Sequence, residues 1–161
     1  MGRLTLCLDS ATLIDLIRGR TPNVRDNYRA GVQSGLDFAV PAVVMHQLYS
    51  GIATSRNPSV ERERMEETLI GLPVMDLTGE DVETTGRLAG DLRACGRSIG
   101  DIDTLIAGQA LARGWTVVTR NVRHFGRVAG LTIIDWAVGP APLSADAIEA
   151  RVREADRDVL D

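Results

Sequence analysis

The sequence contains no lysine, because all 18 of its basic residues are arginine. With 22 acidic residues its formal net charge is −4, so the chain lacks the strongly basic balance that is typical of many nucleic-acid-binding domains. Any contact with a phosphate group must therefore come from the planar, forked guanidinium group.

Cysteines, aromatic residues and long apolar runs are also scarce. The two cysteines, Cys7 and Cys95, have no metal-ligand spacing, and we expect free thiols packed as small hydrophobic groups. No apolar run approaches the roughly 20 residues of a membrane span, and the N-terminal apolar stretch is too short for a signal peptide. We therefore expect a cytoplasmic protein with no membrane partner. Since aromatic residues make up only 4% of the chain, its core must be aliphatic.

Short apolar runs alternate with helical segments along all 161 residues. Strands are predicted at residues 4–8, 36–40, 72–77, 116–119 and 131–134. Helices are predicted at residues 11–18, 23–34, 42–53, 61–71, 78–95 and 101–113, and a last one follows Ser144. The alternation predicts an α/β fold with a central parallel sheet of four or five strands and helices on both faces. Pro140 and Pro142 mark a linker, which divides a domain at 1–137 from a linker and C-terminal amphipathic helix at 138–161.

Four polar side chains lie where strands of such a sheet end. Asp9 and Asn121 directly follow predicted strands, and Asp103 lies in the first turn of a helix. Gln47 lies in the helix after the second strand. Because ligands collect at the carboxyl ends of strands in open α/β sheets, we expect these four side chains to converge there.

Carboxylates without a histidine or cysteine at ligand spacing indicate a hard cation, Mg²⁺ or Mn²⁺. Such a cation can supply a bound water as nucleophile and offset the charge on a pentacovalent phosphate. Asp9 and Asp103 are the predicted metal ligands. Asp101 is either a third ligand or the cap of its helix, and the sequence leaves both interpretations open.

Three segments together carry a family resemblance. They are LCLDSATLIDLI at residues 6–17, PAVVMHQLYSGI at 41–52 and IGDIDTLIAGQALARGWTVVTRNVRHFGRVAGLTIIDW at 99–136. In this order they resemble the PIN-domain ribonucleases, specifically the VapC-type toxins of bacterial toxin–antitoxin pairs. The resemblance covers roughly residues 4–136, and its third segment is the most specific.

The resemblance implies a PIN-like three-layer α/β/α fold and a metal-dependent endoribonuclease. It places Asp9, Gln47, Asp103 and Asn121 at the four catalytic positions. It also implies an RNA substrate of the tRNA or rRNA class, a cognate antitoxin that covers the site, and a homodimer. The candidates for phosphate contacts are Arg18, Arg20, Arg25, Arg120, Arg123 and Arg127.

Two positions depart from the family pattern. Gln47 stands where the family has glutamate, and Asn121 stands at the fourth acidic position, where the family often has asparagine. Whether Gln47 is natural or engineered stays open, and so does the alternative of an inactive PIN-like module that acts through protein or RNA contacts. A receiver- or phosphatase-type enzyme is disfavoured, because the chain has no paired aspartates after the first strand and no lysine.

Overall fold

The computed structural model describes residues 3 to 158. Its strands are β1 (Thr5–Leu8), β2 (Asp37–Pro41), β3 (Val74–Met75), β4 (Thr116–Val118) and β5 (Ile133–Ile134). Its helices are α1 (Ser10–Arg18), α2 (Pro22–Gln33), α3 (Ala42–Ala53), α4 (Pro58–Leu69), α5 (Gly79–Ala94), α6 (Asp101–Arg113), α7 (Val122–Phe125) and α8 (Ala145–Asp158).

The strands form one parallel sheet in the order β3-β2-β1-β4-β5. β1 is central, and its last residue, Leu8, pairs with Val118 at the end of β4. The residues that follow β1 and β4 therefore emerge next to each other at the carboxyl edge of the sheet. The predicted parallel sheet of four or five strands is confirmed.

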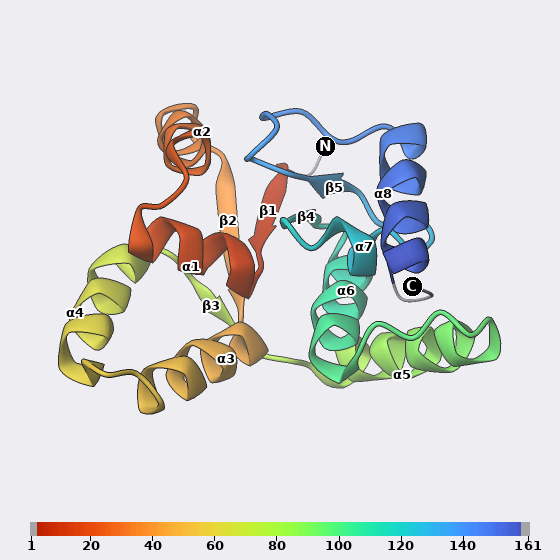
Figure 1. Cartoon of the computed structure of the whole chain (residues 1–161). Coiled ribbons are helices and arrows are strands. Elements are labelled where there is room, and N and C mark those ends of the chain that lie inside the picture. Colours follow the sequence, from red (N-terminus) through yellow and green to blue (C-terminus); the bar gives the residue numbers. More distant parts are fainter. Residues whose placement is uncertain (1–2, 159–161) are drawn as a thin grey trace.

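Helices flank the sheet in two groups (Figure 1). Helices α1 to α4 gather beside β2 and β3, whereas α5 to α8 gather beside β4 and β5. Within the first group α1 packs against α2, α3 and α4, and within the second α5 packs on α6 and α7 on α8. The chain thus has the helix–sheet–helix arrangement that its alternating pattern predicts.

The core is mainly aliphatic, as the composition predicts, and Leu8 and Val118 are fully buried. Three of its aromatic residues form one cluster. Trp136 lies 6.2 Å from Tyr28 and 6.4 Å from Phe38, measured between ring centroids. These contacts fasten α2 and the exit of β5 to the amino-terminal half of β2.

Helix α5 is joined to α6 by a buried ion pair. Thr78 and Asp81 form the predicted capping box at the start of α5. Asp81 also accepts hydrogen bonds from Arg113, whose Nε lies 3.0 Å from Oδ1 and whose Nη2 lies 2.5 Å from Oδ2. The hydrogen bonds from Arg113 hold the pKa of Asp81 well below its usual range.

The two helices approach most closely at Gly108. A Cβ atom there would lie 2.7 Å from Cα and 2.9 Å from Cβ of Thr85. We expect Gly108→Ala to lower the free energy of unfolding by about 1–3 kcal/mol, because the backbone of α5 must move away. Gly90→Ala, on the open face of α5 with nothing within 4 Å of a Cβ, is the control and should stabilise by about 0.5–1 kcal/mol. Urea unfolding measures both, and equal effects of the two changes would contradict the packing argument.

Helix α8 packs against the end of α7 at another glycine. A Cβ on Gly126 would lie 2.6 Å from Cγ2 of Ile148 and 3.0 Å from Cγ2 of Val152. Both side chains belong to the apolar stripe expected on this helix together with Ala155 and Val159, and Val159 lies outside the described residues. The missing side chain at Gly126 is what lets α8 lie directly on the domain.

Several element limits differ from the sequence prediction. β3 and β5 have two residues each, shorter than the predicted runs 72–77 and 131–134, because both lie at the edges of the sheet and pair with one strand each. α4 begins at Pro58 instead of residue 61, since proline is favoured in the first turn. Residues 122–125, expected to be a loop, form the short helix α7.

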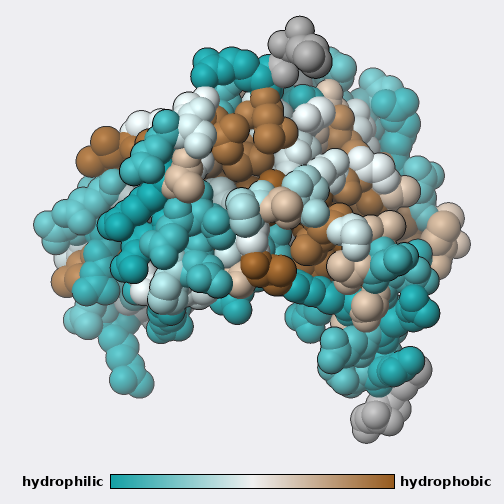
Figure 2. Space-filling view, turned by 90° about the horizontal axis from the view of Figure 1, so that it is seen from above, coloured by the Kyte–Doolittle hydropathy of each residue, from teal (hydrophilic) through white to brown (hydrophobic). Residues whose placement is uncertain are grey.

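The described surface carries hydrophobic side chains in limited areas. Figure 2 shows hydrophobic groups gathered towards the middle of one face, with hydrophilic side chains covering its flanks. Cys7 is buried but Cys95 is exposed, so the expected packing as a small hydrophobic group holds for Cys7 alone. Between residues 3 and 158, no helix combines the length and the apolar character that a membrane crossing requires.

Candidate active site

Asp9 follows β1 and is the N-cap of α1. Its backbone is extended, with φ −79° and ψ 173°, and its Oδ1 accepts the backbone N–H of Thr12 at 2.8 Å. Its Oδ2 accepts a hydrogen bond from the hydroxyl of Thr119, which follows β4. The Asp9 residue is only 3% exposed, so both oxygens are held in fixed directions at the carboxyl edge of the sheet.

Asp103 lies in the first turn of α6 and is contacted by two side chains from the segment after β4. Its Oδ2 accepts a hydrogen bond from Nδ2 of Asn121 at 3.0 Å and lies 2.7 Å from Nδ1 of His124. Because a carboxylate oxygen only accepts, Nδ1 of His124 carries the proton in this contact. The helix α7 is what brings Asn121 and His124 to the same oxygen.

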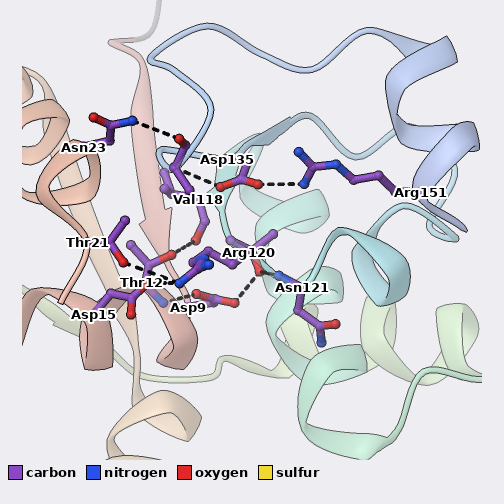
Figure 3. A network of polar contacts seen from close by, with 12 residues as sticks. Asp9, Thr12, Asp15, Thr21, Asn23, Val118, Arg120, Asn121, Asp135 and Arg151 are labelled. Carbon is purple, nitrogen blue, oxygen red and sulfur yellow. Dashed lines mark hydrogen bonds and ion pairs between the residues drawn. The ribbon is translucent and has the colours of Figure 1, made fainter. Parts of the chain in front are cut away.

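Thr119 joins the two carboxylates through hydrogen bonds. Its hydroxyl donates to Asp9 and accepts the backbone N–H of Asn121 at 2.8 Å. A continuous chain of contacts therefore runs from Asp9 through Thr119 and Asn121 to Asp103. Figure 3 shows Asp9 and Asn121 in this network. The two carboxylates, which are far apart in the sequence, belong to one polar cluster.

Burial raises the pKa of Asp9 to about 6, and hydrogen bonds from Thr119 and Thr12 oppose that rise. The negative charge of Asp103 adds to it. Two carboxylates close enough to repel each other and only partly compensated by neutral donors favour a cation between them. No arginine donates a hydrogen bond to either carboxylate within residues 3–158.

The donor atoms suit a hard divalent cation. Oδ1 of Asp103 and Oδ1 of Asn121 accept no hydrogen bond within the described chain, so both are free to bind a ligand. All available donors are oxygens, which Mg²⁺ and Mn²⁺ prefer. Among residues 3–158 no group of three or more histidine, cysteine, aspartate or glutamate side chains could hold a metal ion, so a cation at this site would need water for most of its coordination.

The PIN domain family matches residues 6–131 of this chain. The chain belongs to the PIN-domain family. It is 29% identical over 134 residues to the tRNA(fMet)-specific endonuclease VapC of Shigella flexneri, and this match covers 83% of the chain and 99% of that protein. It is also 29% identical over 119 residues to ribonuclease VapC19 of Mycobacterium tuberculosis strain H37Rv, covering 73% of the chain and 90% of that protein.

A solved structure supports the same family. DNA-bound VapBC from Salmonella typhimurium superposes on this PIN domain with a TM-score of 0.76 and 28% identity, covering 83% of this chain and 98% of that chain. The resemblance to VapC-type PIN domains, and the PIN-like fold that it implied, are confirmed.

Gln47 is the one residue of the predicted four that has no hydrogen bond to the polar cluster within residues 3–158. It lies on α3 and lines a cavity of about 40 Å³ between α1, α3 and α4, together with Arg18 and Glu61. Its Oε1 is buried and has no hydrogen-bond partner in the described part of the PIN domain. The amide oxygen is therefore poorly accommodated where it stands.

Asp101 begins α6 and is exposed to solvent. The residue that caps this helix is Gly100, with φ 91°, and the cap involves no side-chain hydrogen bond. Capping by the Asp101 side chain, one of the two interpretations of this residue, is therefore wrong. Its role as a metal ligand stays a prediction.

Sequence reasoning missed His124, Thr12 and Asp15. His124 was expected in a loop, and it reaches Asp103 only because residues 122–125 form the short helix α7. Thr12 orients Asp9 and also donates its hydroxyl to the carbonyl of Val118 at 2.9 Å. Asp15 pairs with Arg120 at 2.8 Å, a contact between elements that no local pattern reveals.

The raised pKa of Asp9 predicts a pH-dependent stability. A carboxyl group whose pKa is higher in the folded state stabilises the fold below its unfolded pKa, and this contribution is lost as pH rises through about 6. In metal-free buffer Asp9→Asn should therefore become more stable than the unchanged protein between about pH 4.5 and 7.5, by at most about 3 kcal/mol. Denaturant unfolding at both pH values measures this difference, with the exposed Asp101→Asn as control. A difference that stays constant with pH would contradict the prediction.

Proposed function

We propose that this PIN domain is a toxin endoribonuclease that hydrolyses RNA phosphodiester bonds with Mg²⁺ or Mn²⁺ held at Asp9 and Asp103. The observation that carries the proposal is the hydrogen-bonded cluster of Asp9, Thr119, Asn121 and Asp103 at the carboxyl edge of the sheet. The names of the similar proteins support it, because they are a tRNA(fMet)-specific endonuclease and ribonucleases. We propose an RNA of the tRNA or rRNA class as the substrate.

The protein contributes a prearranged site. Oδ1 of Asp103, Oδ1 of Asn121 and the Asp9 carboxylate would hold the cation, with Asp101 as a candidate third acidic ligand in the same first turn of α6 as Asp103. A bound cation of this kind supplies a Lewis acid for the phosphate and an activated water. Thr12 and Thr119 keep Asp9 oriented, and His124 keeps Oδ2 of Asp103 occupied so that its other oxygen faces the ligand. These contacts reduce the rearrangement that substrate binding requires.

The proposed protein partners are a cognate antitoxin and a second copy of this chain. Support for the antitoxin is the similarity to solved VapBC complexes from Salmonella typhimurium and nontypeable Haemophilus influenzae, at 28% and 25% identity. An antitoxin segment that covers the carboxyl edge would block access to Asp9 and Asp103. A short reading frame beside the gene would identify it.

A second function is a catalytically inactive PIN module that binds RNA or protein. Gln47 favours it, because an amide at the family's glutamate position contributes no charge towards a cation. The inactive module and the nuclease share a fold and an RNA-binding face but differ in turnover.

A cleavage assay separates the two functions. The purified protein is incubated with bulk bacterial tRNA in Mn²⁺, in Mg²⁺ and in EDTA, and fragments are resolved on a denaturing gel. Cleavage that needs the metal and is absent in EDTA is the expected result. Binding of tRNA without cleavage in either metal would reject the nuclease and support the inactive module.

A further inference from the structure

We propose that α8 is part of the RNA-binding surface, and that the groove between α8 and the start of α7 holds the phosphodiester backbone next to the scissile bond. This inference rests on the proposed ribonuclease function. The groove measures about 380 Å³ and is lined by Arg120, Asn121, Val122, Arg123, Arg151, Glu154, Ala155 and Asp158.

The groove begins at the candidate active site. Asn121 lines the groove and at the same time donates its hydrogen bond to Asp103. A strand of RNA whose scissile phosphate lies at Asp9 and Asp103 must continue past one side of the site, and this groove is an open path from Asn121. Figure 3 shows Arg120 pairing with Asp15, and Arg151 reaching from α8 towards Asp135.

Helix α8 lies beyond residues 6–131, the part of the chain that the PIN-domain family matches. The Shigella relative is matched over 99% of its length by 83% of this chain, so this chain has residues that the relative lacks. The wall of the groove that α8 forms therefore lies outside the matched domain, and so does any preference that this wall imposes on the substrate.

Two ion pairs hold α8 in place along the groove. Nη1 of Arg151 lies 2.6 Å from Oδ2 of Asp135, which is buried at the exit of β5. Arg127 pairs with Asp156 on the same helix. Together with the close contact at Gly126, these pairs make α8 a fixed wall of the domain.

The arginines keep free donors that point to a phosphate ligand. Arg120 and Arg151 each use one terminal nitrogen, Nη1, in their ion pairs with Asp15 and Asp135, which leaves other N–H groups of each guanidinium available. Arg123 is exposed and makes no ion pair within residues 3–158. Three arginines therefore line one groove, and forked guanidinium groups suit phosphate oxygens.

The composition of the walls distinguishes RNA from a protein partner. The only hydrophobic residues of the groove are Val122, which is buried, and Ala155. The core of a protein–protein interface needs larger apolar or aromatic groups than these. Glu154 and Asp158 on α8 repel phosphate, so we place the backbone against Arg120 and Arg123 on the opposite wall.

The test measures binding of bulk bacterial tRNA in the Asp103→Asn background, which we expect not to cut it. Arg123→Ala should weaken binding about threefold to tenfold and lower the slope of log Kd against log salt by about 0.7–0.9. Glu154→Gln should tighten binding. Arg153→Ala is the matched control, because Arg153 is exposed on α8, pairs with Glu149 of the same helix, and does not line the groove. Arg151→Lys keeps a positive charge that can pair with Asp135 but removes the forked guanidinium group. It therefore tests whether the guanidinium group contributes to tRNA binding while the attachment of α8 is retained.

The outcomes separate the groove from the nuclease proposal. Failure of the parent protein to bind tRNA at any salt concentration would count against the ribonuclease function itself. A second outcome is that the parent binds tRNA well while Arg123→Ala and Glu154→Gln leave the affinity and the salt dependence unchanged. That result would reject the groove as an RNA-binding site and leave the nuclease proposal intact. Unchanged tRNA affinity with loss of binding to the antitoxin encoded beside the gene would assign the groove to that protein and reject our proposal. In the active protein, Arg123→Ala should raise KM for tRNA and leave kcat unchanged.

Discussion

RNA cleavage should fall on the order of a hundredfold or more in Asp103→Asn, because the change removes a unit charge from the proposed cation site, and a cation there would supply several kcal/mol of transition-state stabilisation. Asparagine has nearly the same shape as aspartate and keeps an oxygen to accept the hydrogen bond from Asn121. The fold should therefore be retained. The affinity for Mn²⁺, measured by calorimetry, should fall together with the rate.

The matched control is Asp91→Asn, on α5. Asp91 is exposed and lines a separate groove that lies away from the polar cluster. Its Mn²⁺ affinity and cleavage rate should equal those of the unchanged protein. If Asp103→Asn binds Mn²⁺ as tightly as the unchanged protein does, Asp103 is not a metal ligand, whatever happens to the rate.

Gln47→Glu should raise RNA cleavage at least tenfold, which corresponds to about 1.4 kcal/mol of activation free energy. The added carboxylate stands at the family's glutamate position and supplies a charge that the amide lacks. In metal-free buffer the protein should become less stable, since Oε1 of Gln47 is already buried without a donor and an ionised group there loses more hydration. Mn²⁺ should reverse this loss, because a ligand that binds only the folded state stabilises it.

Arg18 provides the competing explanation for this position. It lines the same cavity and is 3.8 Å from Glu61, so it can also pair with a new carboxylate. If Arg18 pairs with the carboxylate introduced by Gln47→Glu, stability rises without metal and neither Mn²⁺ affinity nor cleavage increases. That result would exclude position 47 from the active site. Gln47→Met, of similar volume and uncharged, controls for packing in the cavity.

Local sequence signals predicted much of this fold. The Thr78–Asp81 capping box marks the start of α5, and Gly114 marks the end of α6. The β-branched run before Thr119 marks the strand β4. The edge strands were less predictable, because their length depends on pairing with β2 or β4 and not on their own residues. Helix α7 is only four residues long, too short for a periodic pattern to show.

The two acids of the candidate site, and Asn121 beside them, were predicted from the sequence, whereas the contacts of Thr12 and His124 were missed. Asp9 and Asp103 could be found because each lies at a strand exit or a helix start. The contact between His124 and Asp103 depends on how α7 turns after β4, and the placement of Gln47 depends on how α3 packs against α1. Both are tertiary facts, which short-range patterns do not contain.

The double role of Asp9 limits how the site can change. Its carboxylate caps α1 and is also proposed to bind the cation, so one side chain serves both folding and catalysis. Alanine there would lose the cap at about 1 kcal/mol, whereas asparagine, serine and threonine can still accept the Thr12 N–H. A descendant of this protein that has lost its activity should therefore carry another capping residue at position 9 rather than an arbitrary one. The range of substitutions expected there is limited to side chains that can accept the Thr12 N–H.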